Sequence, residues 1–403
     1  MRKGSQGPWA VAGGALAMFW PGALAFGYTG VMGPYWRETF GVGQGATGSI
    51  MFFVLASLGI FMFLVGRWQE RVGPRLMMAI GGVLCGLACL VLAFADNMGM
   101  VYAWGFLNGA ASCFTYMPAL TVVQRWFPQR RGLVSGIVNL VFGSSAALVV
   151  PLFNVMLNGL GYRTMNLLVG VLAVATGLLA AALASDPTRL SAAAGAAPPP
   201  PAVPSTTTRQ ALRSGNFWLI WLTWASMGSA GVAMVVLSVG FGQSLGLSVQ
   251  SAAVILTTFN LTNGLSRILT GYFSDRIRRT LTMAAAFALA GIAYFLLPHV
   301  GSLGLAAFLA AVIGFAFGTL FAVSAPLAVD CFGLKHFGSI FGLIFTAYGF
   351  FSGLAGPSLS GFLLDGSGWS YTGVFAYLGV FCLVAAVTIS LVKPVPKVVP
   401  ALA

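Results

Sequence analysis

Apolar residues fall along this 403-residue chain in long runs, separated by short polar breaks. About 20 apolar residues are enough for one helix to cross a bilayer. The runs have about this length, so the pattern predicts twelve membrane-spanning helices. They lie near residues 9–35, 45–66, 76–95, 99–124, 132–157, 164–184, 216–241, 250–273, 281–298, 302–329, 338–364 and 372–392.

The break after the sixth run differs from the others in length and composition. Ser191–Thr208 is a low-complexity stretch rich in Ala and Pro, which predicts a semi-rigid linker without a packed core. We therefore expect an N-terminal six-helix bundle over residues 1–185, a cytoplasmic linker over 186–214 and a C-terminal six-helix bundle over 215–403. Ser214-Gly215-Asn216 are capping residues for the helix that follows the linker.

The two halves repeat each other at an offset of 205 or 206 residues. Gly66 and Glu70, after the second run, recur as Gly271 and Asp275 after the eighth. Four residues of the fifth run recur in the same way on the eleventh: Gly132, Gly136, Gly143 and Pro151 match Gly338, Gly342, Gly349 and Pro357. Two linked six-helix repeats are typical of secondary transporters, whose substrate site lies at the midplane between the repeats.

Composition supports the membrane assignment, and the distribution of charge predicts an orientation. Hydrophobic residues make up 58% of the chain and charged residues 7%, which no soluble fold tolerates. Seventeen of the 20 basic residues fall at the termini and in the loops near residues 70, 128, 200, 277 and 335. The positive-inside rule then places both termini in the cytoplasm, and we expect the inner membrane of a bacterium. The net charge of +13 indicates attraction to anionic membrane lipids rather than to nucleic acid.

Arg267 is a permanent positive charge inside the eighth run. Arginine at the bilayer centre costs roughly 2.5–3.5 kcal/mol on insertion scales. Asn260, Asn263 and Arg267 are spaced i, i+3 and i+7, so they share one helix face, which we expect to line a water-filled cavity. The alternatives are an arginine that reaches the interface or clamps a neighbouring helix. Arg267 lies eight residues before Asp275, about 12 Å inside the cytoplasmic end, so we interpret it as an anion receptor.

Several segments resemble the major facilitator superfamily. Gly66–Arg75 is similar to its signature between helices 2 and 3, with Glu70 where Asp is usual. Arg125–Leu133 and Asp330–Gly333 resemble segments of the monocarboxylate transporters and the oxalate/formate exchangers, and Arg267 falls where both keep their substrate arginine. The resemblance implies an all-α integral membrane protein with the major facilitator fold. It also implies a transporter, functional as a monomer, that moves short monocarboxylates of the L-lactate or pyruvate type by alternating access.

Further candidate residues follow from the same comparison and from depth in the membrane. Glu70 and Asp275 can each cap a helix N-terminus and pair with arginine, so we expect them to hold a cytoplasmic gate together with Arg71 and Arg276. The hydroxyl of Tyr116, at the depth of Arg267, can donate to the substrate. Packing between helices is the alternative for every aromatic candidate for the substrate pocket, which are Tyr28, Tyr116, Phe317, Phe321 and Tyr348.

Two departures from these relatives bear on substrate and coupling. Monocarboxylate transporters usually carry Asp one turn before the arginine, where this chain has Asn263, and the second cation of the oxalate exchanger reads here as Tyr348. One cation matches one carboxylate, since a second charge would stay unpaired in a poorly hydrated site. The resemblance implies proton symport. Asn263 instead favours exchange of one carboxylate for another, and a carboxylate exchanger of the oxalate/formate type is the alternative function.

Other classes of function fit the sequence less well. An enzyme in the membrane would need a buried cluster of His, Cys or acids, but the seven acids lie at or near the ends of the runs. The five cysteines form no CxxC pair and have no His nearby, so we expect neither cofactor nor metal. A receptor would usually carry an appended soluble domain. A drug exporter of the same fold remains a rival, although it usually suits cationic substrates, for which Arg267 has the wrong sign.

Overall fold

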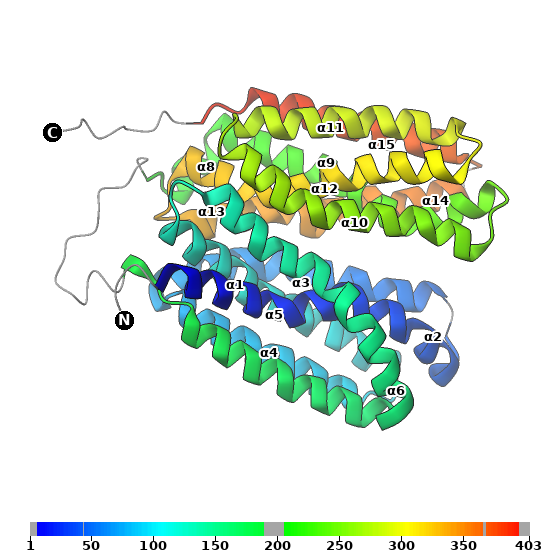
Figure 1. Ribbon diagram of the computed structural model, residues 1–403, viewed down its shortest axis with the longest axis horizontal. Helices are drawn as coiled ribbons and strands as arrows, with labels where there is room; N and C mark the ends of the chain where they lie inside the picture. The colour runs from blue at the N-terminus through cyan, green and yellow to red at the C-terminus, as the bar shows by residue number, and fades with distance from the viewer. Residues whose placement is uncertain (1–5, 43, 189–204, 366–367, 395–403) are drawn as a thin grey trace. The chain divides into compact units, whose positions relative to one another are not determined.

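The computed structural model describes residues 6–42, 44–188, 205–365 and 368–394, and every regular element in those ranges is a helix (Figure 1). Within this part of the chain, nine helices are long and apolar enough to cross a membrane. Helix also covers the three other predicted runs, near 9–35, 132–157 and 250–273, so each of the twelve runs is helical. Bilayer thickness therefore explains most of the element lengths.

The described part of the first half is built from helices joined by short turns. The helices are α1 (Gln6–Gly22), the π-helix η2 (Ala23–Tyr28), α2 (Thr29–Phe40), α3 (Gln44–Val72), α4 (Pro74–Ala93), α5 (Met98–Trp126) and α6 (Arg131–Leu183). The last of these covers two predicted runs, which Gly161 separates with φ 75° and ψ 166°. Glycine adopts this backbone conformation without steric cost, so it marks the turn between the fifth and sixth runs.

The second half begins with a short helix in the predicted linker. The elements are α8 (Thr208–Leu212), α9 (Gly215–Ser244), α10 (Val249–Ser274), α11 (Arg279–Leu296), the 3₁₀ turn η3 (Leu297–His299), α12 (Leu303–Phe332), α13 (Phe337–Thr346), the π-helices η4 (Ala347–Ser352) and η5 (Leu354–Ser358), α14 (Leu359–Asp365) and α15 (Tyr371–Leu391). The Ser214 side chain accepts a hydrogen bond from the Phe217 amide at 3.3 Å, which confirms the predicted cap of α9. Most of the low-complexity stretch, residues 191–204, lies outside the described residues.

By density of internal contacts the chain forms two compact units. Unit 1 comprises Met1–Gln129, Ile137–Pro201 and Leu334–Leu343, and unit 2 comprises Arg130–Gly136, Ala202–Gly333 and Ile344–Ala403. Each unit therefore includes one short segment from the other half of the sequence: the start of α13 in unit 1, and the start of α6 in unit 2. The boundaries expected at residues 185 and 215 stay a prediction.

The predicted internal repeat appears as the same backbone contacts in both units. In unit 1, a Cβ atom added to Gly66 would collide with the Gly338 backbone, and one added to Gly342 would collide with the Met62 carbonyl. In unit 2, the corresponding collisions join Gly271 to Gly132, and Gly136 to the Arg267 carbonyl. Only glycine permits such close approach of two backbones, so these repeated glycines serve packing.

Candidate functional site

Arg267 lies in the second half of α10, and its side chain is buried in unit 2. Only 3% of the residue is exposed. Its Nε and Nη2 atoms donate to Asn263 Oδ1, one helical turn earlier, at 3.4 and 3.3 Å. The guanidinium carbon also lies 4.9 Å from the centroid of the Phe321 ring on α12, within the range of a cation–π interaction. Asn263 and Phe321 are both neutral, and these two contacts orient the guanidinium.

A group of aromatic rings continues from Phe321 and surrounds this part of unit 2. The Phe321 ring centroid lies 5.2 Å from that of Phe317 and 5.5 Å from that of Tyr348, both nearly perpendicular to it. Trp224 on α9 packs against Phe321 at 5.0 Å. Tyr348 belongs to η4, a π-helical turn of the kind often found at functional positions. The structure thus brings Asn263, Phe317, Phe321 and Tyr348 together with Arg267.

Close packing of α12 against α10 fixes the backbone beneath these side chains. A Cβ atom added to Gly318 would come closer than 3.0 Å to both the Asn263 carbonyl oxygen and Ser266 Oγ. One added to Gly314, a turn earlier, would collide with the Phe259 carbonyl. The two glycines therefore place Asn263 and Arg267 at a defined distance from the Phe317–Phe321 face of α12.

Three other predicted substrate residues have different surroundings. Asn260 is exposed, although it lies on the same helical repeat as Asn263 and Arg267. In unit 1, the Tyr116 hydroxyl donates to Asn139 Oδ1 at 3.0 Å. Tyr28 is fully buried and donates to Asn166 Oδ1 at 2.6 Å.

Tyr28 and Tyr116 thus belong to separate polar pairs within unit 1. The Tyr28 ring packs among Trp36, Trp104 and Phe153, with ring centroids at 6.0, 5.4 and 4.9 Å. A buried hydroxyl with a short bond to an amide and three aromatic neighbours is the usual arrangement of a structural tyrosine.

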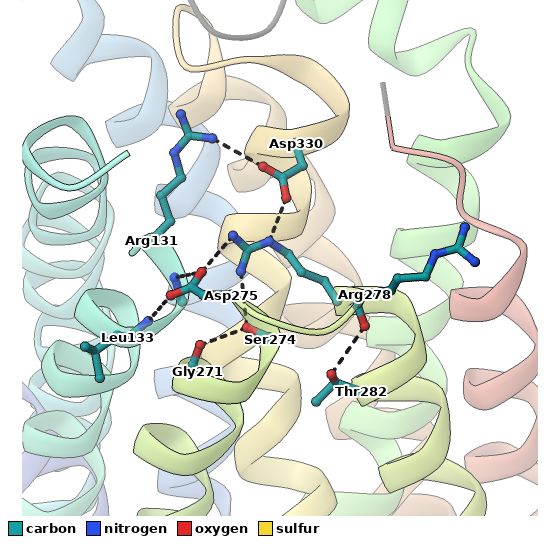
Figure 2. Close-up of polar contacts among 10 residues, drawn as sticks. Arg131, Leu133, Gly271, Ser274, Asp275, Arg278, Thr282 and Asp330 are labelled. Atoms are coloured by element: carbon teal, nitrogen blue, oxygen red, sulfur yellow. Dashed lines mark hydrogen bonds and ion pairs between the residues drawn. The ribbon is translucent and has the colours of Figure 1, made fainter. Parts of the chain in front are cut away.

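The predicted gate residue Asp275 caps the first turn of α6 within unit 2. Its Oδ1 and Oδ2 atoms accept from the Gly132 and Leu133 amides at 2.9 and 3.0 Å (Figure 2). These amides belong to the first turn of α6, where no intrahelical partner exists. The negative charge also stabilises the positive end of the helix dipole. The capping role expected of a carboxylate at this position is therefore present.

Two arginines and a second carboxylate extend this arrangement. Arg279 Nη2 lies 2.9 Å from Asp275 Oδ1, and Arg279 Nε donates to Asp330 Oδ2 at 2.6 Å. Arg131 Nη1 donates to the other oxygen of Asp330 at 3.2 Å (Figure 2). Burial lowers the pKa of Arg131, while the charge of Asp330 raises it. All four side chains are largely buried, which makes this a desolvated charge cluster with alternating signs.

Glu70 makes the equivalent contact in unit 1. It accepts from Ser339 Oγ at 2.9 Å and from the Ser339 amide at 3.4 Å, in the first turn of α13. His336 Nδ1 lies 3.3 Å from its other oxygen. Glu70 and Ser339 correspond to Asp275 and Leu133 in the repeat, so both halves use the same cap. The predicted Arg276 is exposed instead, with its guanidinium carbon 3.7 Å from the centroid of the Tyr272 ring.

These contacts include several residues to which the sequence analysis assigned no role. Arg131, Arg279 and Asp330 form the buried cluster, and Trp224 completes the aromatic group. Arg131 and Asp330 could have been proposed as functional residues, because they lie in the two segments that resemble carboxylate transporters. For Asn139 no pattern in the sequence indicated a role, because its contact with Tyr116 links residues 23 positions apart on different helices.

Curated relatives of this chain include two kinds of carboxylate transporter. The oxalate:formate antiporter of Oxalobacter formigenes is 27% identical over 344 residues, which cover 83% of this chain and 80% of the relative. Monocarboxylate transporter 13 of Rattus norvegicus is 26% identical over 376 residues, covering 91% and 85%.

Solved structures show the same fold at lower identity. The fucose:proton symporter of E. coli superposes with a TM-score of 0.71 at 16% identity, covering 96% of this chain and 99% of the symporter. A proton:xylose symporter gives a TM-score of 0.67 at 15% identity, covering 97% and 96%. The profile of the Major Facilitator Superfamily matches residues 15–239 and 222–402. This chain is a multi-pass membrane protein with the major facilitator fold, and it belongs to that superfamily of transporters.

Proposed function

We propose that this transporter moves short monocarboxylates of the L-lactate or pyruvate type by alternating access, and that Arg267 binds the substrate carboxylate. One observation carries the proposal: a guanidinium only 3% exposed lies within α10, oriented by an amide oxygen and an aromatic face. Arginine remains charged under all reachable conditions and binds carboxylates through two parallel hydrogen bonds. One relative is named for oxalate and formate and another for monocarboxylates, and both names support a carboxylate substrate.

The internal repeat supports a substrate with a single carboxylate. The Gly136–Arg267 contact in unit 2 matches the Gly342–Met62 contact in unit 1, so Met62 is the counterpart of Arg267. Of these two equivalent positions, only position 267 carries a cation. A dicarboxylate would need a cation at both. Because a second carboxylate would have to lose its hydration without a partner, oxalate and malonate should compete weakly.

The two capped helix starts are the proposed gate elements. Asp275 holds the first turn of α6, and Glu70 holds the first turn of α13, each through backbone amides. In alternating access such contacts form in one state and break in another, and the buried partners Arg279 and Asp330 make the change in energy large. We place this gate on the cytoplasmic side of a bacterial inner membrane, as the basic loops predict.

Proton symport is the proposed coupling, with exchange as the alternative. Asn263 occupies the place of an aspartate that would carry a proton, so the empty site keeps the charge of Arg267. Reorienting a site with net positive charge through a poorly hydrated state costs several kcal/mol more than reorienting a neutral site. We therefore expect exchange between loaded sites to be faster than net uptake. A pH jump on empty proteoliposomes separates the two: uphill lactate accumulation driven by outside acid supports symport, and accumulation only with a carboxylate inside establishes exchange.

Substitution of Arg267 tests the proposal. Arg267→Lys keeps the charge but loses the planar fork, so radiolabelled L-lactate and pyruvate uptake into proteoliposomes should be severely impaired. Arg267→Gln should abolish uptake while the purified protein keeps its helical content and its elution volume. Normal uptake by Arg267→Gln would remove Arg267 from the substrate site and, with it, the carboxylate assignment.

A further inference from the structure

A groove between α10, α11 and α12 opens on the surface of unit 2. Its volume is about 590 Å³. Phe273 on α10, Ile277 in the turn after it, Leu281 and Leu289 on α11, and Phe308 on α12 line it, and each is about half exposed. Exposed apolar side chains at this depth meet hydrocarbon rather than water, because the chain spans a membrane. The groove is therefore accessible to the lipid around the protein.

The polar groups of the groove are already used within the protein. Thr262 Oγ1 donates to the Ala311 carbonyl at 2.7 Å, Thr270 Oγ1 to the Ser266 carbonyl at 2.6 Å, and Thr282 Oγ1 to the Arg278 carbonyl at 3.3 Å. A ligand inside the groove thus meets methyl, methylene and aromatic groups. Between Thr262 and Phe273 the groove follows about 16 Å of α10. This exceeds the ~15 Å half-thickness of the hydrocarbon core, so a whole acyl chain fits along it.

One end of the groove carries positive charge. Arg276 and Arg278 flank the lining residue Ile277, and both are exposed. The acids described near this end, Asp275 and Asp330, are bound by Arg279 and Arg131. Figure 2 shows the Arg278 side chain directed away from both of these acids. The charges of Arg276 and Arg278 are therefore available to a ligand outside the cluster.

We propose that this groove is a binding site for a phospholipid with an anionic headgroup. One acyl chain lies along the apolar lining, and the phosphate lies at Arg276 and Arg278. Basic pockets between transmembrane helices on the cytoplasmic side are suited to anionic headgroups. The aromatic ring of Tyr272 holds the Arg276 guanidinium in place, which reduces the ordering needed when the phosphate binds. The site is independent of the substrate proposed above.

The test uses a photoreactive phosphatidylglycerol with a diazirine in its acyl chain, and the matching phosphatidylcholine, in nanodiscs that contain the full chain. After irradiation, cross-linked peptides are mapped by mass spectrometry. We expect phosphatidylglycerol to label α10, α11 and α12 at the groove in preference to the other helices. Arg276→Gln combined with Arg278→Gln should reduce that labelling by about fivefold for each arginine, and leave phosphatidylcholine labelling unchanged.

Two further variants make the result specific. Ala285 is exposed in the groove lining, so Ala285→Trp fills the groove without disturbing the core and should block labelling by both lipids. Arg209→Gln combined with Arg213→Gln removes the same charge from exposed positions at α8 and should leave labelling unchanged. Labelling spread evenly over all helices would overturn the groove. Equal phosphatidylglycerol labelling in the two double variants would overturn the headgroup site.

Discussion

Gly318→Ala should damage transport more than it damages stability. The added Cβ atom would approach the Asn263 carbonyl oxygen and Ser266 Oγ to less than 3.0 Å, a separation that real Cβ atoms essentially never show. Ordinary contacts of this kind begin near 3.5 Å, so α10 must move away from α12 by at least about 0.5 Å. Asn263 and Arg267 lie on the displaced helix, whereas their partner Phe321 lies on α12.

Two magnitudes follow from this displacement. Overpacking of a close helix contact costs about 1–3 kcal/mol, which lowers the Tm of a unit of this size by a few degrees. Misplacing a binding group by about 1 Å can lower a rate about 100-fold. A displacement of about 0.5 Å should therefore lower lactate uptake by roughly tenfold. Uptake into proteoliposomes and thermal unfolding in detergent measure the two effects separately.

Gly304→Ala is the matched control on the same helix. Nothing lies within 4 Å of the Cβ atom that it adds, and alanine is a better helix former than glycine. We expect unchanged uptake and equal or higher Tm. If Gly318→Ala transported lactate as well as Gly304→Ala does, then the distance between α10 and α12 would not control the site, and the geometry proposed for Arg267 would be wrong.

Four further substitutions test separate parts of the structure. If the wild type proves to be the exchanger, Asn263→Asp should shift lactate uptake towards dependence on outside acid, measured as the ratio of uptake at pH 5.5 and 7.5. Asp330→Asn leaves buried arginines without their shared carboxylate and should cost about 3–5 kcal/mol in thermal unfolding, unlike Asp96→Asn at an exposed site. Tyr28→Phe should lower stability by about 1–3 kcal/mol with unchanged lactate affinity, and an altered affinity would assign the hydroxyl to the substrate. Arg267→Met should fold normally and bind no lactate in calorimetry.

Local patterns in the sequence predicted the helices well. The length of each helix follows the thickness of the bilayer, and the apolar runs have about the same length. The run at 216–241, for example, predicts α9. The repeat was also visible, because glycines such as Gly132 and Gly338 must recur wherever the same backbone contact recurs. The π-helical turns η2 and η4 were not predicted, since an extra residue in a helical turn leaves the apolar pattern nearly unchanged.

Contacts between distant residues were less accessible from the sequence. Asp330 and Arg131 are 199 residues apart, and nothing in a single sequence pairs one buried acid with one arginine among many. Asn260 stays a prediction: the spacing places it on the Asn263–Arg267 face, and its exposure depends on packing, which periodicity alone does not determine. Arg276 was expected at the gate for its position after Asp275, and the neighbouring Arg279 makes the buried contact instead.

The repeat separates what the fold requires at position 267 from what function requires. Met62 and Arg267 make the same backbone contact with Gly342 and Gly136, and both are buried, 1% and 3% exposed. An unbranched apolar side chain therefore satisfies the packing at this position, without the roughly 2.5–3.5 kcal/mol that arginine costs in a membrane. Since the fold accepts methionine in one half, the charge in the other half needs a chemical reason. The carboxylate ligand that we propose would supply that reason, and the same argument explains why only one half of the repeat should contact it by charge.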